Sequence, residues 1–114
     1  MADKWKKKFI AERNRLNDLV FASGHLGIKR FFALDEQAYH EAALSAKTKE
    51  LMGLTASMVL RCNDCIAYHL GKCHEAGVTK EEFYEAFNVA LIVSGSIVIP
   101  HLRIAAEKME ALFD

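Results

Sequence analysis

The sequence predicts an all-α protein of about six helices. Apolar residues recur at helical spacing along the chain, and no stretch alternates between apolar and polar residues as a half-buried strand would. Capping residues and glycine-containing breaks divide this pattern into segments of helical length. With 114 residues the chain can build one hydrophobic core but not two, so we expect a single helical domain over residues 1–114.

The first half of the chain contains three expected helices. The first begins near the N-terminus and ends before the Ser23-Gly24 stop. The second covers residues 28–44 and has an internal boundary near Asp35. The third covers residues 47–60 and turns one apolar row inward, formed by Leu51, Leu54, Met58 and Val59.

A fourth helix should follow a turn over residues 61–64. Asn63 and Asp64 favour this position because short polar side chains satisfy free backbone amides at a helix start and compete with the backbone inside a helix. We expect the helix to end at Gly77.

Local signals mark the last two helices. Thr79 and Glu82 form a capping box that opens a fifth helix, and Gly95 ends it. Pro100 is tolerated in the first turn of a sixth helix that runs to about Leu112. The fifth helix should be the buried central one, because apolar residues cover most of its circumference, namely Phe83, Phe87, Val89, Leu91, Ile92 and Val93.

The charge balance excludes several kinds of partner. Fifteen Lys and Arg residues match fifteen Asp and Glu residues, so the formal net charge is zero and no global field attracts nucleic acid or an anionic membrane. We expect no apolar run of about 18 residues and no signal peptide, and therefore a cytoplasmic protein without a membrane partner. The N-terminal lysines predict a solvated helix face rather than a targeting arm; they are Lys4, Lys6, Lys7 and Lys8.

The apolar and cysteine contents suggest assembly and redox chemistry. Hydrophobic residues make up 52% of the chain, which is high for a small monomer and predicts a buried interface between copies of the chain. Three cysteines in a reducing compartment favour catalysis, redox cycling or metal binding over a structural staple.

Cys62, Cys65 and His69 form a CxxCxxxH run, whose offsets place the three side chains on one face of a helix. A helix N-terminus favours the thiolate, which is the reactive form of cysteine. Two cysteines separated by two residues can cycle between dithiol and disulfide. His69 lies one turn after Cys65, where its ring could carry a proton to or from that sulfur. Asp64, between the cysteines, opposes thiolate formation.

Glu50 lies 12 residues before Cys62 (62 − 50 = 12). If the third helix folds back against the fourth, Glu50 comes level with residues 69–73 and can hydrogen-bond His69. The carboxylate would then orient the imidazole, and the imidazole would serve the sulfur.

With Glu50, eleven intervening residues and then Cys62-x-x-Cys65-x-x-x-His69, the sequence resembles the alkylhydroperoxidase D-like branch of the carboxymuconolactone decarboxylase superfamily, in a single-repeat form. The similarity covers about residues 28–112. It includes the segments Lys49-Glu50-Leu51, Glu75-Ala76-Gly77-Val78 and Glu81-Glu82.

This resemblance implies an all-helical homo-oligomer, usually a trimer or hexamer. It implies that Cys62 and Cys65, assisted by His69 and Glu50, reduce hydroperoxides or a partner's disulfide and are themselves reduced by a thiol or a partner redox protein. Decarboxylase members generally lack the cysteine pair, so a lyase reaction of that kind is disfavoured. We expect no bound cofactor or metal.

Other interpretations of the motif stay open. Cys62, Cys65, His69 and Cys73 are types of zinc ligand, but along one helical stripe they span about 16 Å and cannot surround one ion. The cysteines could be inert buried residues, which is the role expected of Cys73. A non-catalytic helical oligomer could use the pair to sense redox state or to bind a partner. His101 is expected to be a structural histidine, with a place in a cleft as the alternative.

Overall fold

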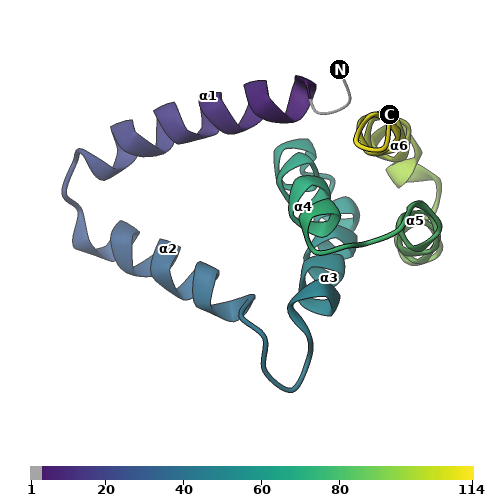
Figure 1. The fold of residues 1–114 in the computed structure, drawn as a ribbon, viewed down its shortest axis with the longest axis horizontal. Helices are drawn as coiled ribbons and strands as arrows, with labels where there is room; N and C mark the ends of the chain where they lie inside the picture. The colour runs from purple at the N-terminus through teal and green to yellow at the C-terminus, as the bar shows by residue number, and fades with distance from the viewer. Residues whose placement is uncertain (1–3) are drawn as a thin grey trace.

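The computed structural model describes residues 4–114 and confirms the all-α fold (Figure 1). Residues 1–3 of the expected domain lie outside this range. Within it the chain contains no strand and forms α1 (Lys4–Phe21), α2 (Leu26–Ala38), α3 (Ala46–Val59), α4 (Asn63–Glu75), α5 (Lys80–Ser94), the short 3-10 helix η1 (Gly95–Val98) and α6 (Ile99–Ala111).

The helices divide into a packed body and a spread N-terminal pair. α3 packs against α4 and α5, and α4 also packs against α6. In Figure 1, α1 and α2 form two sides of an open triangle that the α3–α4 pair closes. Neither α1 nor α2 contains a buried residue. The core is therefore built by α3 and the helices that follow it.

α1 is attached to the body near its N-terminal end. Trp5 Nε1 donates a hydrogen bond to the backbone oxygen of Lys108 at 2.9 Å. Lys6 Nζ pairs with Glu75 Oε2 at 2.9 Å, so this lysine is a contact residue and not part of a solvated face. The exposed face that was predicted is formed by the other lysines, Lys4, Lys7 and Lys8.

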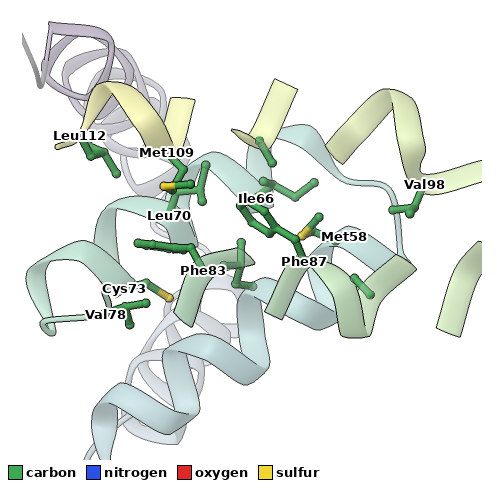
Figure 2. Close-up of a cluster of buried hydrophobic side chains, with 13 residues drawn as sticks. Met58, Ile66, Leu70, Cys73, Val78, Phe83, Phe87, Val98, Met109 and Leu112 are labelled. Carbon is green, nitrogen blue, oxygen red and sulfur yellow. The ribbon is translucent and has the colours of Figure 1, made fainter. Parts of the chain in front are cut away.

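The core lies between α3, α4, α5 and α6 (Figure 2). Phe83 and Phe87 of α5 are its largest side chains. Cys73 is fully buried beside Val78. Burial, with a smaller contribution from the charge of Glu50, raises the pKa of the Cys73 thiol to about 12. We therefore expect this thiol to stay protonated at neutral pH, and its burial agrees with the inert role predicted for it.

Several helix ends agree with the local signals. The Thr79 hydroxyl accepts the Glu82 N–H at 3.2 Å, and the Glu82 carboxylate accepts the Thr79 N–H at 2.9 Å, so the capping box is confirmed. Pro100 lies in the first turn of α6. After α4, Gly77 has φ of 89°, a left-handed conformation that glycine adopts at little cost and that ends a helix.

The second helix ends earlier than predicted. α2 stops at Ala38, and Asp35 lies within it, so there is no internal boundary. Residues 40–45 form a loop, because Ser45 caps α3 by accepting the backbone N–H of Thr48 at 3.1 Å. This cap and the reversal of the chain override the helix propensity of the alanines in the loop.

The prediction that α5 is the buried central helix is wrong. α5 buries only Phe83, Phe87 and Ala90. Three of its other apolar side chains face outward, with Val89, Ile92 and Val93 exposed by 53%, 78% and 66%. The apolar circumference therefore forms two surfaces, one against the core of this chain and one directed away from it.

The expectation that no long apolar run exists is also corrected. The segment Lys80–Ala111, which comprises α5, η1 and α6, is long and apolar enough to cross a membrane by length and composition alone. A stretch of 18 residues within it has a mean hydropathy of 1.8, and only 17% of that stretch is buried. The core helix of a soluble protein meets the same criterion but is mostly buried, so the finding identifies apolar surface that this chain alone leaves uncovered.

Candidate active site

The turn between α3 and α4 places the cysteine motif at a helix start. Arg61 has φ of 59°, in the left-handed region that glycine usually occupies at such a position. The N–H of Cys62 donates to Ser57 O at 3.1 Å and that of Arg61 donates to Met58 O at 2.9 Å, which satisfies carbonyls at the end of α3. Cys62 therefore closes α3 and is also the N-cap of α4.

Cys62 and Cys65 form a disulfide, with their Cα atoms 5.3 Å apart. Cys65 lies in the first turn of α4 as predicted, whereas Cys62 lies at the cap just before it. The Cys62 sulfur accepts the backbone N–H of Cys65 at 3.2 Å. In the reduced protein this N–H and the positive end of the helix dipole would favour a negatively charged sulfur.

Glu50 and His69 form a buried pair between α3 and α4, each 8% exposed. His69 Nδ1 lies 2.9 Å from Glu50 Oε1. Because a carboxylate only accepts hydrogen bonds, Nδ1 carries the hydrogen and Glu50 fixes the orientation of the ring. The predicted contact is confirmed, and the catalytic roles of the two residues stay predictions.

Tyr39 completes the surroundings of His69 and was not predicted. Its hydroxyl lies 3.4 Å from His69 Nε2, a long hydrogen bond, and the two ring centroids are 5.3 Å apart. Burial, followed by the charges of Asp35 and Glu50, raises the pKa of Tyr39, so the hydroxyl stays a neutral donor. Tyr39 follows the end of α2, and no spacing in the sequence relates it to a histidine 30 residues later.

Gly53 makes room for this arrangement. A Cβ at this position would lie 2.7 Å from His69 Cε1 and 2.9 Å from the Tyr39 hydroxyl, closer than such atoms can approach. Glycine inside a helix costs about 1 kcal/mol relative to alanine. A glycine within the predicted third helix, three residues after Glu50, therefore needs a reason, and this could have identified Gly53 as a site residue from the sequence.

The site thus has two parts on neighbouring turns of α4. The disulfide lies at the start of the helix, and His69 follows one turn after Cys65. Over residues 4–114 the hydrogen bonds of the imidazole go to Glu50 and Tyr39 and not to a sulfur. No three His, Cys, Asp or Glu side chains of the described chain come together in a way that could hold a metal ion.

His101 lies beside the cysteine motif. Its Nδ1 is 2.8 Å from Asn63 Oδ1, so it links the start of α6 to the residue that follows Cys62. This contact agrees with the structural role expected for His101.

The chain matches known proteins over most of its length. The model of the carboxymuconolactone decarboxylase family matches residues 28–108. Two crystal structures from Thermotoga maritima are 54% identical to this chain. One covers 94% of both chains with a TM-score of 0.91. The other, described as a carboxymuconolactone decarboxylase family protein for which a role in the antioxidative response is suggested, covers 93% of this chain and 90% of its own with a TM-score of 0.88.

Two more distant proteins extend the comparison. Protein 4 of the cox locus of Paracoccus denitrificans is 30% identical over 84 residues, which are 74% of this chain and 72% of that protein. A carboxymuconolactone decarboxylase family protein of Legionella pneumophila, 24% identical, covers 98% of this chain and 99% of its own with a TM-score of 0.83. At that identity the likeness shows the fold alone.

Two glycine replacements on facing helices test the fit around His69. Gly53→Ala should lower the free energy of unfolding by about 1–3 kcal/mol, because the new methyl group must displace the His69 and Tyr39 rings. Gly71→Ala is the matched control, since its Cβ would meet only the flexible Lys6 side chain, at 3.2 Å, and should be neutral or stabilising by up to about 1 kcal/mol. Urea denaturation measures both, and equal effects would contradict the close fit.

Proposed function

The chain belongs to the carboxymuconolactone decarboxylase family, and from this premise we propose that it is a thiol-dependent antioxidant enzyme that reduces hydroperoxides or a partner's disulfide. The observation that carries the proposal is the Cys62–Cys65 disulfide at a helix N-terminus, one turn from an imidazole that Glu50 orients. The antioxidative role suggested for the Thermotoga maritima relative supports it. A cytoplasmic location, where thiol reductants are plentiful, stays a prediction.

The reaction starts from the reduced pair. One thiolate attacks the terminal oxygen of the hydroperoxide, the O–O bond breaks, and the sulfur becomes a sulfenic acid while the alkoxide leaves and takes up a proton as an alcohol. The second thiol attacks the sulfenic sulfur, which forms the Cys62–Cys65 disulfide and releases water. Two electrons pass from the thiols to the peroxide. An external dithiol then restores the pair by thiol–disulfide exchange.

His69 supplies and accepts the protons of this cycle. Glu50 holds the ring through Nδ1, which leaves Nε2 as the atom that exchanges a proton. Because Tyr39 rather than a sulfur contacts Nε2, the proton reaches the sulfur region through an oxygen of the substrate or of water. Reduction of a partner's disulfide would use the same thiolate and the same imidazole.

Turnover with cysteine variants tests the enzyme directly. Wild type should consume an organic hydroperoxide repeatedly when a dithiol is supplied, whereas Cys62→Ser and Cys65→Ser should each lose turnover, because neither can close the disulfide. Cys73→Ser is the control and should remain active, since its thiol is buried and protonated. A single stoichiometric oxidation without turnover would instead favour the redox-sensing alternative.

A double-mutant cycle tests the pair that handles the proton. His69→Ala and Glu50→Gln should each slow turnover by about 10²- to 10⁴-fold, the usual contribution of general acid–base catalysis. The double variant should be little slower than the slower single variant, because the two residues act as a unit. Steady-state rates with the three variants decide the point, and fully additive losses would mean that the residues act separately.

We also propose that the protein is a homo-oligomer, a trimer or hexamer as in the family it resembles. The support is the outward apolar surface of α5, η1 and α6, where several large apolar side chains are exposed. Its main side chains are Val89, Ile92, Val93, Ile97 and Ile104. A second copy of the chain could cover this surface without any change within the subunit.

Light scattering at low micromolar concentration tests assembly. We expect a mass several times the 12.8 kDa of one chain. Ile92→Glu should shift the protein to a folded monomer, because a charge would be buried in the interface. Circular dichroism checks that this variant keeps its helices, and a wild-type monomer would refute the proposal.

A further inference from the structure

A cavity of about 680 Å³ lies between the α1–α2 pair and α4. At one side it reaches Glu50 and Tyr39, the two residues that hold the imidazole. Phe21 and Phe32, whose rings pack 4.8 Å apart, supply an apolar wall from α1 and α2. The cavity therefore combines a hydrocarbon surface with access to the proton-handling part of the site.

A second cavity, of about 320 Å³, continues this space toward the cysteines. It is lined by Asp64, which stands between Cys62 and Cys65. Arg13 and Phe32 line both cavities, so the hollow runs along α4 from Lys72 to Asp64, the residue before Cys65. A small molecule held there would lie against the first turn of α4, which also carries Cys65.

Two cations converge on Tyr68 in the wall of the larger cavity. The Arg13 guanidinium stacks on the Tyr68 ring, with Cζ 4.1 Å from the ring centroid, and Lys72 Nζ lies 6.0 Å from the same centroid. Neither cation takes part in an ion pair within residues 4–114. Arg15, two residues along α1, differs in this respect because it pairs with Glu12 on the surface.

Three carboxylates also line the cavity but do not neutralise these cations. Glu50 is committed to His69. Asp35 and Glu36 form no ion pair with Arg13 in the described part of the chain. The guanidinium, fixed by stacking, thus keeps its planar set of donors free for a ligand, and this geometry suits a carboxylate that binds through both oxygens.

We propose that Arg13, stacked on Tyr68 and assisted by Lys72, binds the carboxylate of an organic-acid substrate. The inference rests on the proposed function and specifies its substrate class as a small carboxylic acid that carries a hydroperoxide or disulfide. Tyr68 lies three residues after Cys65, so the carboxylate would sit about one helical turn along α4 from that sulfur. The carboxylate serves only as an anchor, and the redox steps are those of the dithiol cycle.

Binding of benzoate tests the site without any need for turnover. In NMR titrations of the oxidised protein, benzoate should shift the signals of Tyr68 and Arg13, and its neutral analogue benzamide should not. Arg13→Gln should weaken benzoate binding at least about tenfold, the usual effect of losing a charged hydrogen-bonded pair. Arg15→Gln is the matched control and should bind as wild type does. Equal binding of benzoate and benzamide, no benzoate binding, or no effect of Arg13→Gln would overturn the inference.

Turnover gives a second readout. With cumene hydroperoxide and its ring-carboxylated analogue, wild type should prefer the carboxylated compound in kcat/KM. Arg13→Gln should reduce the ratio of the two kcat/KM values about tenfold, and Arg15→Gln should leave it unchanged. An unchanged ratio in Arg13→Gln overturns the substrate assignment. If neither peroxide is consumed, the proposed function fails, while the benzoate titration still decides whether the carboxylate site exists.

Discussion

The architecture of the site depends on one buried polar contact, the hydrogen bond between Glu50 and His69. A carboxylate in an apolar interface is costly unless it is paired, so this contact requires α3 and α4 to lie close together and in register. The tight turn at Arg61 sets that register, and Gly53 supplies the space that the imidazole occupies. The neighbouring side chains of the core pack around a polar pair that cannot move far without losing its partner.

Most of the helices could be predicted from local chemistry, because a capping residue or a glycine acts within one turn of its own position. The capping box of Thr79 and Glu82 is an example. The contact of Glu50 with His69 could be predicted in another way, because the spacing of the two residues brings them level once α3 and α4 fold back on each other. Tyr39 could not be found in this way, since its approach to the imidazole depends on where the loop after α2 returns the chain. The exposure of α5 was missed for a related reason. An apolar pattern predicts that a helix face is buried, but it does not say whether that face packs against the same chain or against another copy of it.

The two halves of the molecule perform different tasks. α3 to α6 bury the core and carry the imidazole and the cysteines, whereas α1 and α2 contain no fully buried residue and border the larger cavity. The proposed substrate preference would therefore vary through α1 and α2 with little effect on the core. The proposed chemistry and the proposed selectivity lie in different parts of the sequence and meet along one side of α4.

The double role of Cys62 links folding to redox chemistry. One residue closes α3, caps α4 and carries a sulfur of the disulfide, so reduction of that disulfide also changes a hydrogen-bond acceptor at a helix end. Folding and reduction then form a thermodynamic cycle. If the disulfide and dithiol forms differ in folding free energy, the free energy of reduction must differ by the same amount between the folded and the unfolded chain. Substitutions in the turn, at Arg61 for instance, can therefore adjust the redox equilibrium of the pair without touching either cysteine.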